Sequence, residues 1–204
     1  MKQLRQYIRQ ILLERAFDKM DIIQSSDIGI SIEDNDNWVL IEYVRMGKDD
    51  YIETATDEEG LDLGRIIIGR WTEQCVRNDV YTVSRSQAKD GYGPLLYDVA
   101  MEYATLKGSG LMPDRSSVST DAQKVWQYYL NNRSDVGIHQ MDNMENILTP
   151  EKQDNCNQFV SQVWGGKRGD AGLWMDSPLS KRYTRHPGTI NLLRDAGKLK
   201  ERGN

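Results

Sequence analysis

Cysteine, histidine and long apolar segments are scarce in this chain, and each scarcity excludes a class of protein. Two cysteines and two histidines are present among 204 residues. Scattered as they are, they cannot supply the closely spaced ligands of a structural zinc site, so no bound metal is expected. Cys75 and Cys156 lie far apart in the sequence. Reduced thiols in a cytosolic protein are the simpler interpretation, while one disulfide between them stays open.

Apolar runs are short as well, since none approaches the roughly 20 residues that a membrane-spanning helix needs. The N-terminus lacks the apolar core and small-residue cleavage site of a signal peptide. The net charge of −5 argues against a general nucleic-acid binder, and the basic clusters at residues 167–168 and 181–186 are interpreted as solvated loops. We therefore expect a cytoplasmic protein that contacts neither membrane nor nucleic acid, with one sizeable core.

The most informative segment is a glycine-containing turn at residues 88–95, which follows a β-prone run at residues 79–84. Gly91 and Gly93 let the backbone approach a ligand closely, and Pro94 suits the first position of a helix. Backbone N–H groups of the turn and the positive end of the helix favour a bound anion. The segment therefore predicts a phosphate cradle, although a plain turn is an alternative. It lacks both the dinucleotide-binding fingerprint and the Gly-Lys-Ser/Thr of a nucleoside-triphosphate loop.

Two helices are predicted after this turn. The first runs from Pro94 to about Lys107, and an extended run at residues 110–115 follows it. The second starts at Ser119 or Thr120, where Thr120 and Gln123 form a typical capping box. Its apolar face has helical spacing and consists of Ala122, Val125, Trp126, Tyr129 and Leu130. The order of elements is thus strand, phosphate turn, helix, strand, helix.

Over about residues 80–133 this order resembles the GNAT superfamily of acyl-CoA-dependent N-acetyltransferases. The family's pyrophosphate motif, Arg/Gln-x-x-Gly-x-Gly/Ala, is similar to residues 88–93, where Gly91 and Gly93 match and Ala88 stands at the usual Arg or Gln position. The later pattern Asn-x-x-Ala-x-x-Leu-Tyr is similar to residues 119–126. There Ser119 replaces asparagine and Trp126 replaces tyrosine.

The resemblance implies an α/β fold with a GNAT-like mixed central sheet flanked by helices, and acetyl-CoA as co-substrate. In such enzymes the strand before the cradle pairs with the pantetheine arm like an added strand. The amine attacks the thioester directly, and a backbone N–H polarises the carbonyl. The coenzyme-binding residues that the resemblance implies are Val83, Ser84, Ala88, Lys89, Asp90, Gly91, Tyr92, Gly93, Pro94, Leu95, Ser119 and Trp126.

Two residues are the main candidates for proton transfer. An indole cannot replace the family's acidic tyrosine, so Tyr129, nearly one turn beyond Trp126, is the candidate acid, with Tyr128 less well aimed. Glu42 is the candidate base, because it shares one face of a predicted strand at residues 38–44 with apolar neighbours that would raise its pKa. Helix packing for Tyr129 and an exposed edge charge for Glu42 are the alternatives. Weaker candidate bases are Glu73 and Glu102.

Three parts are predicted along the chain: an N-terminal amphipathic leader helix at 1–20, a GNAT-like core at 21–135 and a partly helical extension at 136–204. Helices are expected at residues 149–164 and 189–200. The N-terminal segment resembles leader helices of internal proteins of large tailed phages, which are cut after Leu-x-Glu, as in Leu12-Leu13-Glu14. That resemblance implies a phage-encoded protein, located in the host cytoplasm or packaged in the virion. The alternative is a helix that docks on its own domain.

The predicted function is transfer of an acetyl group from acetyl-CoA to an amine of a protein or small molecule. Ala88 and Trp126 depart from the family pattern and favour the alternative of a non-catalytic, GNAT-fold binding or virion-internal protein that acts through protein contacts. A third interpretation is an α/β domain unrelated to acyl transfer. The sequence leaves the acceptor amine and the oligomeric state open.

Overall fold

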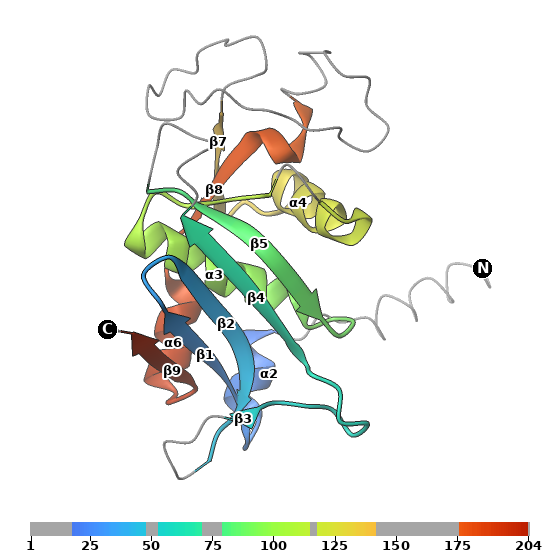
Figure 1. Cartoon of the computed structure of the whole chain (residues 1–204), viewed down its shortest axis with the longest axis vertical. Coiled ribbons are helices and arrows are strands. Elements are labelled where there is room, and N and C mark those ends of the chain that lie inside the picture. The colour runs from blue at the N-terminus through green and yellow to red at the C-terminus, as the bar shows by residue number, and fades with distance from the viewer. Residues whose placement is uncertain (1–17, 48–52, 71–78, 115–117, 142–175, 204) are drawn as a thin grey trace, which may run out of the picture.

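The computed structural model describes residues 18–47, 53–70, 79–114, 118–141 and 176–203. In these ranges nine strands form one mixed open sheet in the order β7-β8-β6-β5-β4-β2-β1-β9, with β3 paired to β2 (Figure 1). The strands are β1 Ile28–Asp34, β2 Trp38–Arg45, β3 Glu53–Thr54, β4 Gly64–Arg70, β5 Tyr81–Ala88, β6 Leu111–Met112, β7 Val136–Gln140, β8 Lys181–Arg185 and β9 Leu199–Gly203. The prediction of a mixed α/β fold is confirmed.

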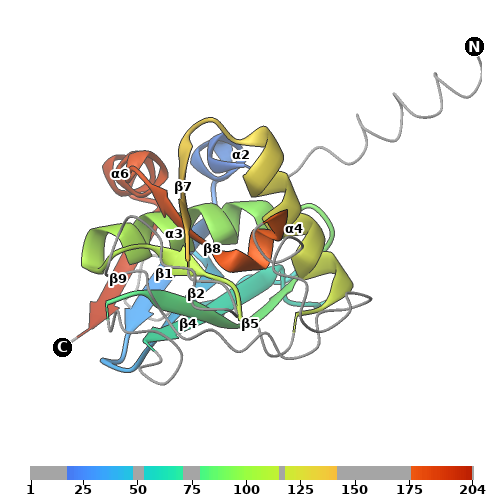
Figure 2. The ribbon, with the colours of Figure 1, turned by 90° about the horizontal axis from the view of Figure 1, so that it is seen from above.

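Four α-helices are described: α2 Lys19–Gln24, α3 Gly93–Lys107, α4 Thr120–Asn132 and α6 Gly188–Asp195. A short 3-10 turn, η2 Pro178–Ser180, precedes β8. Figure 2 shows α2, α3 and α6 on one side of the sheet, with α3 nearest to it. Both helices expected after the glycine turn are present, as α3 and α4. No helix in the described ranges is long and apolar enough to span a membrane.

The strands β1, β2, β4 and β5 form an antiparallel meander. Alternation along β2 buries Val39, Ile41 and Tyr43 against the helices and leaves Glu42 partly exposed on the other face. This is the arrangement that the sequence predicts for the strand at residues 38–44. Asn35, Asp36 and Asn37 form the turn from β1 into β2, and Asp36 has a positive φ of 59°.

The helix α3 is the centre of the core. Nine of its fifteen residues are buried, including Glu102, because the helix packs against several strands of the sheet, among them β4 and β8, and also against α6. The exception at its C-terminal end is Leu106, which is exposed. The helix α4 begins after Ser119, whose Oγ accepts the Ala122 N–H at 3.2 Å. Ser119 therefore caps this helix instead of the predicted capping box of Thr120 and Gln123.

The last third of the chain belongs to the same sheet. β8 lies between β6 and β7 and is antiparallel to both, while β9 lies beside β1 and is parallel to it. The helix expected at residues 189–200 is wrong in its second half. It ends at Asp195, Gly197 adopts a positive φ of 66°, and the chain continues as β9. A glycine in the left-handed region typically ends a helix.

Parts of the predicted organisation lie outside the described residues. They are most of the leader helix at residues 1–20 with its Leu12-Leu13-Glu14 motif, the helix at residues 149–164, both cysteines, Glu73 and the basic cluster at residues 167–168. Within the described part, α2 begins after Asp18, whose carboxylate caps the helix by accepting the N–H groups of Met20 and Asp21.

Gly110 holds the junction between α3 and β6 in a conformation that other residues avoid. Its φ is 118°, and a Cβ placed on it would lie 2.5 Å from the Tyr183 carbonyl oxygen. We expect Gly110→Ala to lower the free energy of unfolding by at least about 2 kcal/mol, because backbone strain and a backbone clash add. Gly60→Ala is the control: its φ is also positive, but no atom lies within 4 Å of the added methyl, so strain alone costs about 1 kcal/mol. Chemical denaturation of both variants measures the difference, and equal losses would contradict the clash.

Candidate functional site

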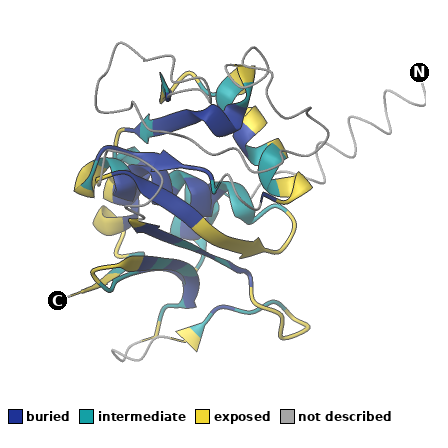
Figure 3. Ribbon diagram, turned by 45° about the horizontal axis from the view of Figure 1, so that its top comes forward, coloured by how far each residue is buried: buried dark blue, intermediate teal, exposed yellow. Residues whose placement is uncertain are grey.

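The strand β5 loses its partner on one edge. It pairs with β4 from Tyr81 to Ala88, but with β6 only at Tyr81 and Thr82. Beyond Thr82 no described strand covers this edge, and residues 84–88 are all exposed. Figure 3 shows this change from buried to exposed along β5. We call residues 84–88 the open edge of β5.

A β-bulge at Ser84 marks the start of the open edge. Ile68 pairs with Val83 and Ile67 pairs with Arg85, so Ser84 is an extra residue in β5. Its hydroxyl donates a hydrogen bond to the Ile67 carbonyl oxygen at 3.1 Å. Bulges of this kind re-aim the side chains that follow them and are common beside active sites. Here the bulge moves Ser86 to the helix side of the sheet.

The predicted glycine turn joins the open edge to α3. The Lys89 N–H donates to Leu63 O at 3.0 Å, and the Tyr92 N–H donates to Lys89 O at 3.0 Å. Gly91 has a φ of 86°, which is the conformation that glycine makes accessible. No side chain caps the N-terminus of α3, and Pro94 lies in its first turn. The first N–H groups of α3 therefore face outward at the positive end of the helix.

Neither the backbone conformation nor the packing around it requires Gly93 to be a glycine. Its φ is not positive, and an added Cβ would meet nothing closer than the Ala88 Cβ at 3.8 Å. Gly64, on the adjacent strand, is the contrast, because a Cβ there would lie 2.7 Å from the Ala88 Cβ. The space in front of Gly93 is open, so the missing side chain leaves room for a ligand at the start of α3.

The other residues predicted to form the cradle, from Lys89 to Leu95, differ in their contacts and burial. The Lys89 ammonium forms an ion pair with Asp57 at 2.6 Å, which raises the pKa of Lys89 and lowers that of Asp57. Asp90 is exposed, whereas Leu95 is buried beneath the turn. Tyr92 packs edge-on against Tyr43 at 5.4 Å between ring centroids. The Tyr43 hydroxyl donates to Tyr92 O at 2.8 Å and ties the turn to β2.

A cavity of about 200 Å³ lies along the open edge. Residues of β5, α3 and α4 line it, together with Asp114, Val118 and Ser119 from the chain before α4. Four residues predicted to bind coenzyme line it: Val83, Ser84, Ser119 and Trp126. The sequence analysis missed the other lining residues, Arg85, Ser86, Tyr97, Asp114, Val118 and Ala122. Helical spacing could have found Tyr97, which lies four residues after Gly93 and so on the same side of α3.

Aromatic rings form the inner wall of the cavity. Trp126 is 1% exposed and packs edge-on against Tyr97, with 5.4 Å between ring centroids. Its other neighbour is Tyr183 of β8, at 4.9 Å. Trp126 therefore closes the cavity as a packed wall, and the hydroxyl groups among the lining residues belong to Ser84, Ser86, Tyr97 and Ser119.

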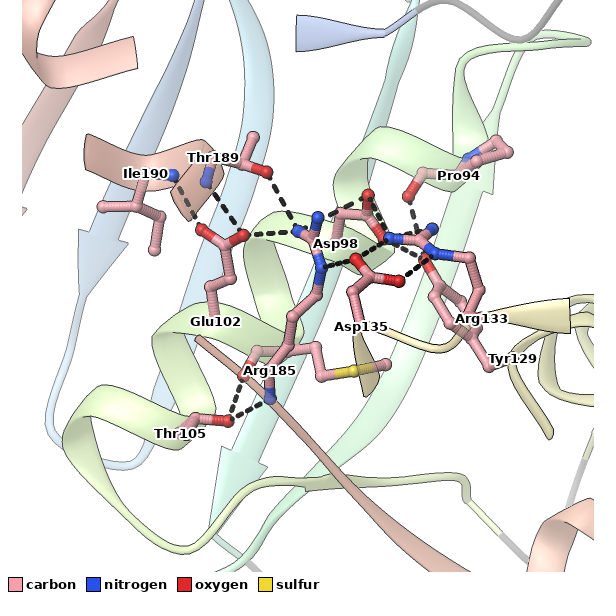
Figure 4. Close-up of polar contacts among 11 residues, drawn as sticks. Pro94, Asp98, Glu102, Thr105, Tyr129, Arg133, Asp135, Arg185, Thr189 and Ile190 are labelled. Carbon is pink, nitrogen blue, oxygen red and sulfur yellow. Dashed lines mark hydrogen bonds and ion pairs between the residues drawn. The ribbon is translucent and has the colours of Figure 1, made fainter. Parts of the chain in front are cut away.

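Tyr129, the predicted acid, is not among the residues that line the cavity. Its hydroxyl donates to the Asp98 carboxylate at 2.6 Å and lies 3.2 Å from Pro94 O (Figure 4). Burial and the neighbouring Asp98 raise the pKa of Tyr129 well above its ordinary value. In this position Tyr129 ties the first turn of α3 to α4, and its role as an acid stays a prediction.

Glu42, the predicted base, lies on the face of the sheet away from α3, opposite Arg65 of β4. Burial raises its pKa, and the nearby Arg65 partly opposes this shift. Two strand spacings, about 10 Å, separate β2 from β5. The structure thus does not bring Glu42 and Tyr129 together, because Tyr129 contacts α3 on the other face.

Glu102, a weaker candidate base, lies in the core and holds neighbouring elements together. It is fully buried and pairs with Arg185 of β8. Its carboxylate accepts the N–H groups of Thr189 at 2.9 Å and Ile190 at 2.7 Å, at the start of α6. Arg185, which pairs with Glu102, also forms ion pairs with Asp135 and Asp98 (Figure 4).

Comparison with protein-family models, with curated proteins and with solved structures found no match for this chain. Among the described residues, no group of three or more His, Cys, Asp or Glu side chains is placed to hold a metal ion.

The buried Glu102–Arg185 pair yields a stability prediction. We expect Glu102→Ala to lower the free energy of unfolding by about 3–5 kcal/mol, because it leaves Arg185 and two backbone N–H groups of α6 without this acceptor. Arg194→Ala is the control, since it breaks an ion pair with Glu201 whose side chains are both nearly half exposed. The control should change stability by less than about 1 kcal/mol. Urea denaturation of both variants tests this, and similar losses would refute the special position of Glu102.

The raised pKa of Glu42 predicts a pH-dependent stability. A carboxyl whose pKa is higher in the folded state stabilises the protein as pH falls and destabilises it as pH rises through that pKa. Glu42→Gln should therefore melt at a higher temperature than the wild type at neutral pH. The advantage should disappear once the pH falls below the ordinary pKa of 4.5. Melting curves across this range test the prediction, and a difference that does not change with pH would contradict it.

Proposed function

We propose that this protein is an acyl-CoA-dependent N-acetyltransferase with a GNAT-like fold, acting on an amine of a protein or small molecule. The observation that carries the proposal is the open edge of β5. It begins at a bulge, borders a cavity and ends at a glycine turn that starts a helix without a side-chain cap. The resemblance of residues 80–133 to that family rests on the same segments.

The open edge suits the extended arm of a coenzyme. Its backbone groups are available for pairing in the manner of an added strand, because β6 has already diverged after Thr82. The cavity of about 200 Å³ is smaller than the roughly 300–1,000 Å³ of pockets that enclose whole drug-sized ligands. It fits a narrow chain with the nucleotide left outside.

The glycine turn suits the diphosphate of the same coenzyme. The start of α3 offers outward N–H groups and a positive dipole, and Gly93 leaves the space in front of them open. Arg85 and Lys89 are the nearest cations in the sequence, and Arg85 lines the cavity. Ala88 supplies no side-chain donor where the family has Arg or Gln, so the backbone carries more of the binding here.

In the proposed reaction the amine nitrogen attacks the thioester carbonyl held beside Ser84. A backbone N–H of β5 donates to the carbonyl oxygen as negative charge develops on it. Glu42 accepts the proton of the amine through a chain of water molecules, and its raised pKa suits a base. The leaving thiolate must then receive a proton.

A second candidate function is a non-catalytic, GNAT-fold binding or virion-internal protein. Two observations favour it: Trp126 packs as a wall where the family has a tyrosine, and Asp98 holds the hydroxyl of Tyr129. Such a protein would bind partners without releasing thiol from acetyl-CoA. Turnover in the presence of amines therefore separates the two candidates.

Two substitutions at Gly93 test the cradle: one should raise stability and the other should weaken binding. Gly93→Ala fits the backbone and should raise the free energy of unfolding by roughly 0.4–1 kcal/mol. Gly93→Trp fills the space in front of α3 and should weaken acetyl-CoA binding at least tenfold, equivalent to about 1.4 kcal/mol. Calorimetric titration with acetyl-CoA measures the affinities of the wild type and of Gly93→Trp. Gly188→Trp is the matched control, because Gly188 also begins a helix and faces open space.

The possible results separate cleanly. Binding that Gly93→Trp abolishes and Gly188→Trp preserves would support the cradle. Binding that survives Gly93→Trp would place the coenzyme elsewhere. If the wild type binds no acetyl-CoA at millimolar concentration, the acetyltransferase proposal is wrong.

A further inference from the structure

The proposed reaction needs a proton donor near the sulfur that leaves. Trp126 cannot serve, because an indole is too weak an acid. The Tyr129 hydroxyl donates to Asp98, and Tyr129 is not among the residues that line the cavity, so it is not placed to donate a proton there.

Tyr97 is the tyrosine that does line the cavity. Its ring is buried, only 3% of the residue is exposed, and its hydroxyl shares a hydrogen bond of 2.9 Å with the Ser86 hydroxyl. Ser86 belongs to the open edge of β5, two residues beyond the bulge, and is itself exposed. A buried phenol thus reaches the strand along which the coenzyme arm is proposed to lie, through a serine that also meets solvent.

Resting on the proposed function, we propose that Tyr97 donates the proton to the leaving sulfur and that Ser86 links its hydroxyl to solvent. The family pattern puts the acidic tyrosine on the later helix, where this chain has Trp126. Here the ring of Tyr97 packs against Trp126 at 5.4 Å between centroids, so the hydroxyl comes from α3 instead.

The proton and electron balance of the step is complete. The amine nitrogen forms a bond to the carbonyl carbon, the carbon–sulfur bond breaks, and its electron pair goes to sulfur. The phenolic proton of Tyr97 moves to that sulfur and gives a free thiol. The tyrosinate regains a proton from the Ser86 hydroxyl. Solvent returns a proton to Ser86, and the proton that the amine loses is released to solvent.

The surroundings of Tyr97 keep it protonated until it is needed. Burial raises the pKa of Tyr97, and the hydrogen bond from Ser86 partly opposes this shift. The neutral phenol is therefore the form present near neutral pH, and it can donate to a thiolate that develops beside it.

The first test compares three variants, Tyr97→Phe, Tyr129→Phe and Tyr128→Phe. Tyr97→Phe keeps the packed ring and should lower kcat by about 100-fold or more, with little change in the dissociation constant of acetyl-CoA. Tyr128 is nearly half exposed on α4 and is absent from the cavity lining, so Tyr128→Phe should leave kcat unchanged. Melting curves of each variant separate loss of folding from loss of chemistry.

A second measurement does not depend on turnover. The ultraviolet absorbance of the thiolate reports the ionisation of coenzyme A bound to the protein. Donation from Tyr97 stabilises the thiolate, so Tyr97→Phe should raise the pKa of the bound thiol. Tyr129→Phe and Tyr128→Phe should not.

The outcomes distinguish this inference from the function on which it rests. If the wild type releases thiol and Tyr97→Phe keeps its kcat and the thiol pKa, Tyr97 is not the donor and the acetyltransferase still stands. If folded Tyr129→Phe alone loses kcat, the donor is Tyr129. If the wild type neither binds acetyl-CoA nor releases thiol, both proposals are overturned.

Discussion

The buried carboxylate of Glu102 is the interaction on which the arrangement of the later elements depends. It lies within the central helix α3, fully buried, and accepts two N–H groups from the start of α6 while pairing with Arg185 of β8. Burying a charge is costly unless its hydrogen-bonding capacity is filled. This carboxylate therefore specifies where β8 and α6 meet α3, and α6 leads directly into β9.

Side chains linked to Glu102 through Arg185 also hold the helix that begins at the candidate site. Asp98, one turn before Glu102 on α3, accepts from Tyr129 and from Arg133 at 3.0 Å. Tyr129 also lies beside Pro94 O in the first turn of α3. The glycine turn thus sits at the end of a helix held firmly along its length, which suits a cradle that must keep its N–H groups in place before a ligand arrives.

Local patterns in the sequence predicted the elements that carry their own signals. Helical spacing and caps indicated α3 and α4, and alternation indicated β2 and the placement of Glu42 on the face opposite Ile41 and Tyr43. The position of Ser86 could not be predicted, because the bulge at Ser84 reverses the alternation after it. The end of α6 and the strand β9 were also missed. β9 owes its pairing to β1, more than 160 residues earlier in the chain, and no local pattern reports such a contact.

The sheet has two kinds of incomplete margin, and they treat other polypeptides differently. On its outer rim, β9 presents the charged residues Lys200, Glu201 and Arg202, and charge on a rim strand discourages addition of a strand from another molecule. The gap after Thr82 is internal, walled by α3 and α4. Charge on β9 thus disfavours strand pairing between copies along that rim, whereas the open edge of β5 is left for the extended coenzyme arm that we propose.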